Sequence, residues 1–284
     1  HPLPPLSAPN ETLVVVGAGL AGLRCAETAR AEGFPGRIIL VGEEPHVPYD
    51  RPPLSKAVLL EPGAEATIGL STSAALADAN VELRLGQPAA AIDREGRALV
   101  LADGARIAYD RLVLATGSAT RTLRDLPPGR PGVHYLRGLD DALALRAALA
   151  DARRVVVIGA GVIGLEVAAV AVAPARSVTV IEAADRVMGR AACPAISAFM
   201  ADLHRAAGVV LKLSASVAGV AATGNGYALE LSDGSTVEAD LVVVGVGVTP
   251  NDALARDCGL EVEAGGVCVD GYGMTSDPAI YAAG

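Results

Sequence analysis

The sequence predicts an α/β fold with two βαβ domains built on parallel sheets, the second inserted in the first and each carrying a small antiparallel β insertion. Three observations lead to this prediction. A strand, a glycine-rich turn, a helix and a second strand occur twice, with the first glycines at Gly17 and Gly159. Each copy is followed by short alternating segments and a closing strand that ends near a glycine. The length of 284 residues also suits two domains of roughly 150 residues each.

The first copy begins with a β-branched strand at Thr12–Val16, which runs into the turn Gly17–Gly22. The helix that follows ends near Gly33, and a second strand is predicted over Arg37–Gly42, followed by Glu43. Four alternating segments separated by turn residues are predicted as hairpin strands: Val81–Leu85, Ala89–Asp93, Ala98–Leu101 and Arg106–Tyr109. A buried strand and three small residues close the copy: Arg111–Leu114, Ala115, Thr116 and Gly117.

The second copy repeats this order. Strand Val155–Ile158 precedes the turn Gly159–Gly164, a helix is predicted from Leu165 to about Val172, and strand Ser177–Ile181 ends at Glu182. The insertion and the closing strand are predicted over residues 209–214, 215–220, 227–231, 236–239 and 241–244, followed by Gly245, Val246 and Gly247.

Two segments join the copies. The three prolines within Thr122–Gly132 indicate a linker, and Leu139–Leu149 has the pattern of a short helix. In the tail, a strand is predicted over Val267–Val269. These boundaries predict a first domain of residues 1–119 plus 248–284 and a second domain of residues 120–247.

The composition excludes several classes of protein. Apolar residues make up 51% of the chain and charged residues 19%, which excludes a disordered or collagen-like chain. The net charge of −9, without a run of Lys or Arg, argues against nucleic-acid binding. No apolar run reaches the ~18 residues of a membrane span, and the Pro-rich segment His1–Asn10 lacks the apolar core of a signal peptide.

The cysteines predict neither disulfides nor a metal site. The four of them form no CxxC pair and have no clustered histidines: Cys25, Cys193, Cys258 and Cys268. We therefore expect a cytoplasmic protein without a bound metal.

The two glycine motifs have the GxGxxG spacing of a Rossmann-like dinucleotide-binding turn. The first glycine permits the tight turn, the second lets the backbone approach a pyrophosphate, and the third lets the helix pack on the strand. An acid at the end of the second strand, about 20 residues on, hydrogen-bonds a ribose diol, and Glu43 and Glu182 suit this role. One such motif is weak evidence, but two in the same context predict two dinucleotides and hydride transfer between them.

The acid in the second copy favours NADH over NADPH, because a carboxylate repels a 2′-phosphate. Arg186 and Arg190 lie near Glu182 in the sequence and keep the alternative open.

Several segments together resemble one family. Five segments are similar to those of FAD-dependent pyridine nucleotide-disulfide oxidoreductases: Gly17–Gly22, Tyr49–Lys56 (YDRPPLSK), Ala115–Gly117, Gly159–Glu166 and Gly245–Asn251. Within that superfamily they resemble the NADH:ferredoxin reductases that serve bacterial oxygenases, the putidaredoxin-reductase-like proteins. Apoptosis-inducing-factor proteins are relatives of this family.

The resemblance assigns FAD to the first motif and NADH to the second. It implies that Arg51 and Lys56 lie along the flavin, with Lys56 near its reactive edge, and that Glu166 approaches Lys56 and the nicotinamide amide. Lys56 and Glu166 are therefore the predicted catalytic residues. The alternative for Lys56 is an ordinary surface lysine after a Pro-Pro turn, and the alternative for Glu166 is a solvated helix residue. The cofactor-binding residues that we predict are Gly17, Gly19, Leu20, Ala21, Gly22, Glu43, Arg51, Lys56, Ala90, Ala115, Thr116, Gly117, Arg121, Gly159, Gly161, Val162, Ile163, Gly164, Glu182, Arg190, Gly245, Val246 and Gly247.

The electron acceptor is predicted from an absence in the sequence. Disulfide reductases of the superfamily place a cysteine pair roughly where Arg51–Lys56 stand, but this sequence has no cysteine between Cys25 and Cys193. We therefore expect single electrons to leave for an external carrier, a [2Fe–2S] ferredoxin or a similar one-electron acceptor. A homodimer is compatible with this prediction.

Two other functions stay open. The first is an NADH-sensing flavoprotein like the apoptosis-inducing factors, and the second is an inactive fragment that retains only NAD binding. The family normally continues with Asp after the residue that matches Gly284, and then with a C-terminal interface domain, which this chain lacks. We therefore expect the chain alone to bind FAD weakly or not at all.

Overall fold

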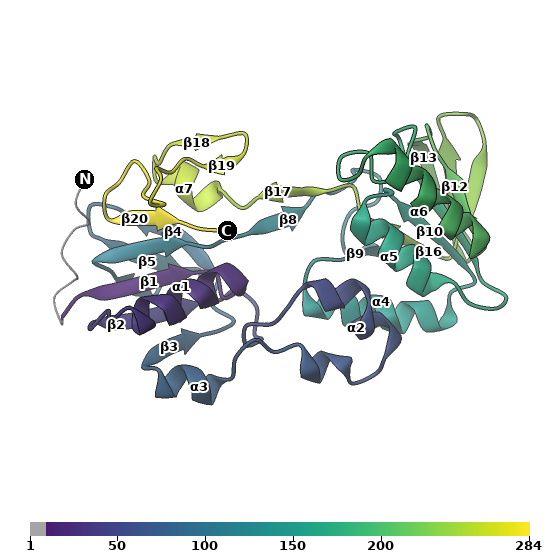
Figure 1. Cartoon of the computed structure of the whole chain (residues 1–284). Helices are drawn as coiled ribbons and strands as arrows, with labels where there is room; N and C mark the ends of the chain where they lie inside the picture. The colour runs from purple at the N-terminus through teal and green to yellow at the C-terminus, as the bar shows by residue number, and fades with distance from the viewer. Residues whose placement is uncertain (1–9) are drawn as a thin grey trace. The chain divides into compact units, whose positions relative to one another are not determined.

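The computed structural model describes residues 10–284 (Figure 1). Most of the predicted Pro-rich leader, His1–Asn10, lies outside the described residues. The described chain divides into two compact units. The first unit contains the described residues up to 50, residues 68–118 and residues 250–284, and the second contains residues 51–67 and 119–249.

The first unit is built on a five-stranded parallel sheet with strand order β20-β7-β1-β2-β3. Its strands are β1 (Thr12–Val16), β2 (Arg37–Val41), β3 (Val81–Arg84), β7 (Arg111–Leu114) and β20 (Ile280–Ala282). Around it lie α1 (Leu20–Ala31), α3 (Ser73–Asp78), α7 (Ala253–Asp257), the antiparallel strands β4 (Ala89–Asp93), β5 (Ala98–Leu101) and β6 (Arg106–Ala108), and the pair β18 (Val262–Glu263) and β19 (Gly266–Val267).

Alternating side chains of β1 divide the core of the first unit in two. Leu13 and Val15 pack with α1 on one face of the sheet, whereas Val14 and Val16 pack with β5 and β6 on the other. Because side chains of a strand alternate between faces, both faces of a buried parallel strand are apolar. The continuous Val-rich run of the sequence is therefore what this strand requires.

The second unit repeats this plan with strand order β12-β11-β10-β16-β9, all parallel. Its strands are β9 (Val133–Tyr135), β10 (Arg154–Ile158), β11 (Ser177–Ile181), β12 (Val209–Lys212) and β16 (Leu241–Val244). Its helices are α2 (Ala57–Leu60), α4 (Leu139–Asp151), α5 (Val162–Ala171) and α6 (Pro194–Ala206), with the short 3-10 turns η1 (Pro52–Ser55) and η2 (Ala64–Thr67).

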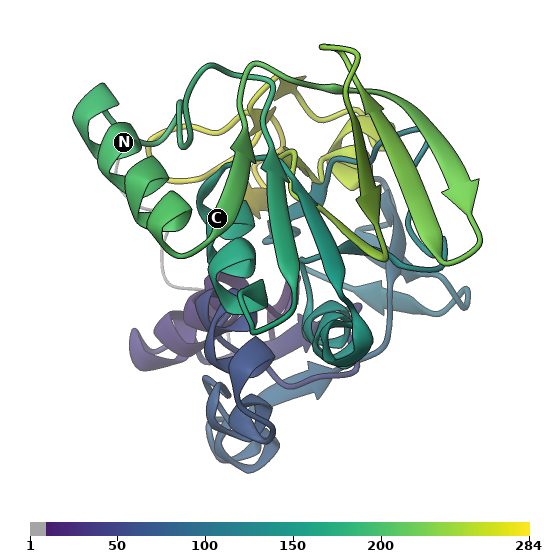
Figure 2. The same ribbon diagram turned by 90° about the vertical axis from the view of Figure 1, so that its right-hand side faces the viewer.

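An antiparallel sheet of three strands covers one face of the second sheet, away from α6 (Figure 2). These strands are β13 (Val217–Thr223), β14 (Gly226–Leu231) and β15 (Thr236–Ala239). The strands β8 (Ser118–Thr120) and β17 (Val248–Pro250) pair with each other, and the chain passes between the units along both. The α/β fold with parallel sheets is thus confirmed.

Two predicted hairpin strands are wrong. The segments that begin at Val81 and Val209 form β3 and β12, which pair in parallel at the outer edges of the two main sheets. An edge strand exposes one side to solvent and therefore alternates like a hairpin strand, so periodicity could not separate the two. The helix of the second copy begins at Val162, three residues earlier than predicted, because the turn glycines hid its first turn. The tail strand is Gly266–Val267 instead of Val267–Val269.

The predicted linker Thr122–Gly132 is packed into the second unit. Leu126 is 1% exposed, and its carbonyl oxygen accepts a hydrogen bond of 2.8 Å from the hydroxyl of Tyr135. That hydroxyl in turn accepts the N–H of Leu123 at 2.9 Å. The prolines indicated irregular backbone correctly, but they say nothing about burial.

No helix within residues 10–284 is long and apolar enough to cross a bilayer.

Candidate functional site

The glycine turn of the second unit is closed by contacts that only glycine allows. A Cβ at Gly159, which has φ of +104°, would lie 2.3 Å from the carbonyl oxygen of Gly245. A Cβ at Gly164 would lie 2.0 Å from the carbonyl oxygen of Gly159. These two positions are therefore required for β10, α5 and the end of β16 to meet.

The middle glycine of the turn is different. A Cβ at Gly161 would meet no atom within 4 Å, and Gly161 lines a pocket. Gly161 is also the N-cap of α5, and the first hydrogen bond inside the helix runs from the N–H of Leu165 to its carbonyl oxygen. The N–H groups of Val162 and Ile163 precede that bond, so this helix end presents donors and a partial positive charge to an anion.

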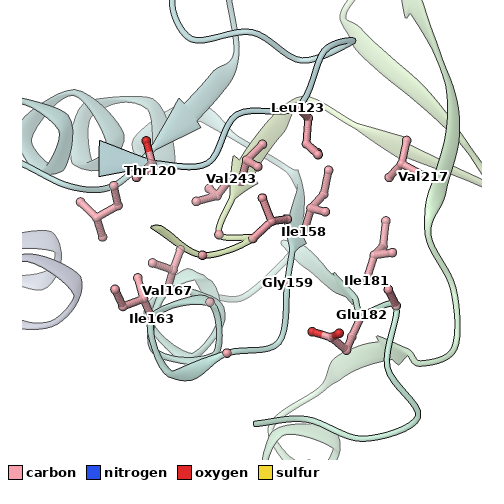
Figure 3. Close-up of a pocket in the computed structure, with 18 of the residues that line it drawn as sticks. Thr120, Leu123, Ile158, Gly159, Ile163, Val167, Ile181, Glu182, Val217 and Val243 are labelled. Atoms are coloured by element: carbon pink, nitrogen blue, oxygen red, sulfur yellow. The ribbon is translucent and has the colours of Figure 1, made fainter. Parts of the chain in front are cut away.

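The pocket has a volume of about 560 Å³ and lies within the second unit, at the carboxyl ends of its parallel strands (Figure 3). Ile163 and Val167 of α5 form one side, and Ile181 and Glu182 at the end of β11 form another. Ten of the predicted cofactor-binding residues line it: Gly159, Gly161, Val162, Ile163, Gly164, Glu182, Arg190, Gly245, Val246 and Gly247.

The Glu182 carboxylate is held in place at the mouth of the glycine turn. One oxygen accepts the N–H of Ala160 at 2.7 Å, and the other accepts the N–H of Ala184 at 2.9 Å. Each carboxylate oxygen has a further lone pair, so both oxygens can still accept the two hydroxyls of a ribose. Arg186 donates to the carbonyl oxygen of Gly189 at 2.8 Å, within its own loop.

Arg121 and Arg190 meet at the turn after β16. The N–H of Arg121 donates to the carbonyl oxygen of Gly247 at 2.9 Å. A Cβ at Gly247, which has φ of +108°, would lie 3.5 Å from a terminal nitrogen of Arg190 and 3.9 Å from Cδ of Arg121. Both arginines are exposed, and Arg190 lines the pocket. They add positive charge beside Gly247, which also lines the pocket.

The two predicted catalytic residues form an ion pair within the second unit. The ammonium of Lys56 lies 2.8 Å from Oε1 of Glu166, and the hydroxyl of Ser55 donates to Oε2 of Glu166 at 2.5 Å. Glu166 follows Ile163 by one turn of α5, although Glu166 itself is not among the residues that line the pocket. The side chain of Lys56 is 51% exposed and that of Glu166 is 25% exposed.

The segment that carries Lys56 is fastened to α4. Arg146 donates to the carbonyl oxygen of Val58 at 3.0 Å and pairs with the carboxylate of Glu65 at 2.8 Å. The hydrogen bond from Arg146 is the main cause that lowers the pKa of Glu65 to about 2. Arg51 donates to the carbonyl oxygen of Arg137 at 2.7 Å. These contacts explain why residues 51–67 group with the second unit, although the sequence boundaries placed them in the first.

The first unit has the same glycine geometry. A Cβ at Gly17, with φ of +112°, would lie 2.1 Å from the carbonyl oxygen of Ala115, and a Cβ at Gly22 would lie 1.8 Å from that of Gly17. A Cβ at Gly19 would meet nothing within 4 Å. The first hydrogen bond inside α1 runs from the N–H of Leu23 to the carbonyl oxygen of Gly19. The N–H groups of Leu20 and Ala21 precede this bond and are therefore available to a ligand. This cradle fits a pyrophosphate as the second one does.

In the first unit, Glu43 stands one residue after the position that corresponds to Glu182 of the second unit. Ile158 pairs with Ile181 and Val16 pairs with Val41, so the position that corresponds to Glu182 is Gly42. A Cβ at Gly42 would lie 2.7 Å from Cβ of Ala18, which leaves no room there for a glutamate. Glu43 follows as an exposed residue.

Other predicted residues of the first unit lie at the ends of strands or in irregular backbone. Ala90 stands where the register between β4 and β5 shifts. The hydroxyl of Thr116 donates to the carbonyl oxygen of Asn251 at 2.7 Å, and the Asn251 amide donates back to the carbonyl oxygen of Thr116 at 2.9 Å. These two bonds hold the turn Ala115–Gly117 against Asn251.

Sequence reasoning missed part of the pocket wall. Val244, Ile158 and Ile181 end parallel strands, and the rule that ligands bind at carboxyl ends of such strands could have found them. Leu123 comes from the segment interpreted as a linker, and Ala215 and Val217 come from the chain before and in the antiparallel insertion. No pattern in the sequence indicates that these three face the pocket.

Known proteins share this architecture. Residues 11–284 match the family model described as pyridine nucleotide-disulphide oxidoreductase. The chain belongs to the pyridine nucleotide-disulphide oxidoreductase family. This confirms the resemblance seen in the motifs. Proteins of this family are oxidoreductases that use FAD and a pyridine nucleotide.

Two curated relatives within this family are similar along almost the whole chain. The ferredoxin–NAD(+) reductase component of the p-cumate 2,3-dioxygenase system of Pseudomonas putida is 44% identical, covering 96% of this chain and 66% of that protein. Rhodocoxin reductase of Rhodococcus erythropolis is 42% identical, covering 96% and 64%. The chain therefore spans less than two thirds of the length of these relatives. The crystal structure of a covalent putidaredoxin reductase–putidaredoxin complex matches with a TM-score of 0.91 and 41% identity, covering 97% of this chain and 67% of that chain.

Proposed function

We propose that this protein is an NADH-dependent flavoprotein reductase that delivers single electrons to a ferredoxin-type [2Fe–2S] protein of an oxygenase system. The observation that carries the proposal is the pocket of the second unit, which combines a helix end suited to an anion with a fixed carboxylate. The pair of Lys56 and Glu166 belongs to the same unit, and Glu166 stands one turn along α5 from the pocket residue Ile163. The name of one relative, the ferredoxin–NAD(+) reductase component of the p-cumate 2,3-dioxygenase system, supports the same function.

NADH binds across the pocket in this proposal. The N–H groups at the start of α5 hold the pyrophosphate, and the open space over Gly161 lets the phosphates approach the backbone. Glu182 accepts the hydroxyls of the adenosine ribose. Arg121 and Arg190 balance the negative charge of the pyrophosphate.

Glu166 and Lys56 act at the nicotinamide. The carboxylate of Glu166 accepts the N–H of the nicotinamide carboxamide and so orients the ring that gives up the hydride. Lys56 pairs with Glu166 at 2.8 Å, and its ammonium compensates negative charge that develops during reduction.

The first unit holds FAD through the glycine cradle of Gly17, Gly19 and Gly22, with Glu43 as the acid for its ribose. FAD, when bound, accepts the two electrons of a hydride and can release them one at a time. The sequence has no cysteine from residue 26 to residue 192, so residues 51–67 carry no thiol that could take up the electrons. The electrons therefore leave for an external carrier, as the ferredoxin in the relatives' names suggests.

Anaerobic reduction by NADH and by NADPH, with the protein kept saturated by added FAD, tests this function. We expect flavin bleaching by NADH at rates at least ten times those with NADPH, followed by reduction of an added [2Fe–2S] ferredoxin in one-electron steps. Absence of flavin reduction by either nucleotide would refute the proposal, and reduction without transfer to any ferredoxin would refute its acceptor.

Replacing Lys56 by Met tests the ion pair. We expect hydride transfer in Lys56→Met to slow by about tenfold at saturating NADH, because one charge-assisted contact at a reacting site is worth about 1.4 kcal/mol or more. Stopped-flow absorbance of the flavin measures the rate. Lys212→Met is the matched control, since Lys212 of β12 is the other lysine of the chain. Equal rates in the two variants would contradict the role of Lys56.

A further inference from the structure

Two consecutive side chains bind the two oxygens of one carboxylate. The hydroxyl of Ser55 donates to Oε2 of Glu166 at 2.5 Å, and the ammonium of Lys56 lies 2.8 Å from Oε1. Ser55 is 5% exposed, whereas the side chain of Lys56 is 51% exposed. Of the two contacts, only that of Ser55 is shielded from water.

We propose that Ser55 is a positioning residue that sets the orientation of the Glu166 carboxylate for the nicotinamide, an inference that rests on the proposed function. The serine hydroxyl has one proton to donate. The carbonyl oxygen of Pro52 lies 3.4 Å from this hydroxyl and the carboxylate oxygen 2.5 Å, so the proton goes to the nearer, charged acceptor.

A second donor changes what the ion pair can do. The last torsion of a glutamate side chain is broad, so a carboxylate held at one oxygen by a flexible lysine can turn about it. A hydroxyl on the other oxygen removes that freedom. Because the hydroxyl is neutral, it leaves the charge balance of Lys56 and Glu166 unchanged.

The clamp leaves acceptor sites free. Each carboxylate oxygen carries two lone pairs, so one remains on each oxygen after Ser55 and Lys56 have donated. The directions of these remaining lone pairs are set once the carboxylate plane is set. A small misplacement of a group that orients a reacting ring is expected to cost more in rate than in binding.

Ser55 can act as a clamp because its own segment is anchored. It ends η1, which packs against both α4 and α5. Arg51, just before η1, donates to the carbonyl oxygen of Arg137, and Arg146 of α4 binds the carbonyl oxygen of Val58 in α2. The hydroxyl therefore approaches Glu166 from a segment tied to the second unit on both sides.

Ser55→Ala in the holoenzyme, kept saturated by added FAD, tests the inference, with Ser197→Ala as the matched control. Ser197 is 1% exposed on α6, and its hydroxyl has no partner among the described residues, so Ser197→Ala removes an equally buried hydroxyl that orients nothing. We expect Ser55→Ala to slow flavin reduction at saturating NADH by about tenfold, to change the Kd for NADH less than about threefold, and Ser197→Ala to change neither.

A double-mutant cycle separates positioning from general damage. In a Glu166→Ala background, Ser55→Ala should lower the rate by less than about twofold, and its effect on the urea midpoint of unfolding should shrink as well. Equal rates for Ser55→Ala and the unsubstituted protein, equal slowing by Ser197→Ala, or independent effects of Ser55 and Glu166 would each overturn the inference.

If NADH binds but does not reduce the unsubstituted holoenzyme, the proposed function fails and the inference with it. The double-mutant coupling between Ser55 and Glu166 in the free energy of unfolding does not require turnover. If this coupling is present but NADH does not reduce the flavin, the proposed function has failed although the contact between the two side chains exists.

Discussion

The three glycines of the second glycine turn have different roles, because a Cβ atom at each position would meet different surroundings. At Gly159 and Gly164 a Cβ would run into backbone carbonyl oxygens. At Gly161 it would enter open space that belongs to the pocket. Gly159 and Gly164 are therefore needed for folding, whereas Gly161 is needed only when a ligand is bound.

Alanine substitutions should separate these roles. Gly161→Ala should leave the free energy of unfolding within about 0.5 kcal/mol, because φ at Gly161 is −73° and nothing is displaced. It should weaken NADH binding at least about tenfold, because the methyl group occupies the approach of the phosphates. Gly159→Ala should lower the free energy of unfolding by about 2 kcal/mol or more through its φ of +104° and the clash with Gly245. Urea unfolding and titration with NADH measure both quantities, and equal stability losses in the two variants would contradict this account.

The carboxylate of Glu182 should decide between the two nicotinamide cofactors. In Glu182→Ala the hydroxyls of the ribose lose their acceptor, and the repulsion of a 2′-phosphate disappears. We expect the KM for NADH to rise about tenfold and that for NADPH to fall, so that the ratio of kcat/KM values shifts toward NADPH by at least about tenfold. Glu230→Ala, on β14, serves as a control. An unchanged ratio would remove Glu182 from the specificity site.

At the scale of elements, the segment of η1, α2 and η2 is held by tertiary contacts, several of which come from one arginine of α4. Arg146 binds carbonyl oxygens of this segment and pairs with Glu65 of η2. The segment is short and its helices have only four residues each, so it gains little stability from its own hydrogen bonds. Its position, and with it the position of Ser55 and Lys56, is set by tertiary contacts.

Acid should loosen this segment in a defined pH range. The pKa of Glu65 is lowered from 4.5 to about 2, so its pairing with Arg146 contributes stability above pH 4.5 that is lost as the pH falls toward 2. Glu65→Gln should therefore be less stable than the unsubstituted protein at pH 6 and approach it at pH 2 to 3. Unfolding midpoints measured across this range test the prediction. A constant difference between the two proteins at all pH values would contradict it.

At the scale of the molecule, two units of the same plan carry two cradles that differ in detail. The second has a fixed carboxylate at Glu182, whereas the first has Gly42 at that position and an exposed Glu43 beside it. The pocket of about 560 Å³ lies entirely within the second unit. The units are thus expected to prefer different dinucleotides.

Hydrogen exchange can locate each ligand. With NAD+ at about 100 times its Kd, which stabilises the bound state by about 2.7 kcal/mol, we expect slower amide exchange in residues 159–167, 181–184 and 245–248. Residues 17–22 should change only when FAD is added. Protection of residues 17–22 by NAD+ at the same concentration would reverse the assignment of the two cradles.

Much of this architecture can be read from local patterns. The runs Thr12–Val16, Ser177–Ile181 and Leu241–Val244 are strands with the predicted bounds, because buried parallel strands are continuous apolar segments next to turn residues. The glycine turns and Glu182 follow from spacing, since the chemistry of a phosphate cradle is local in the chain. The order of strands in the sheets, the burial of Leu126 and the clamp on Glu166 depend instead on which distant segments meet. Ser55 and Glu166 stand 111 residues apart in the chain, and only packing of η1 against α4 and α5 brings a hydroxyl to that carboxylate.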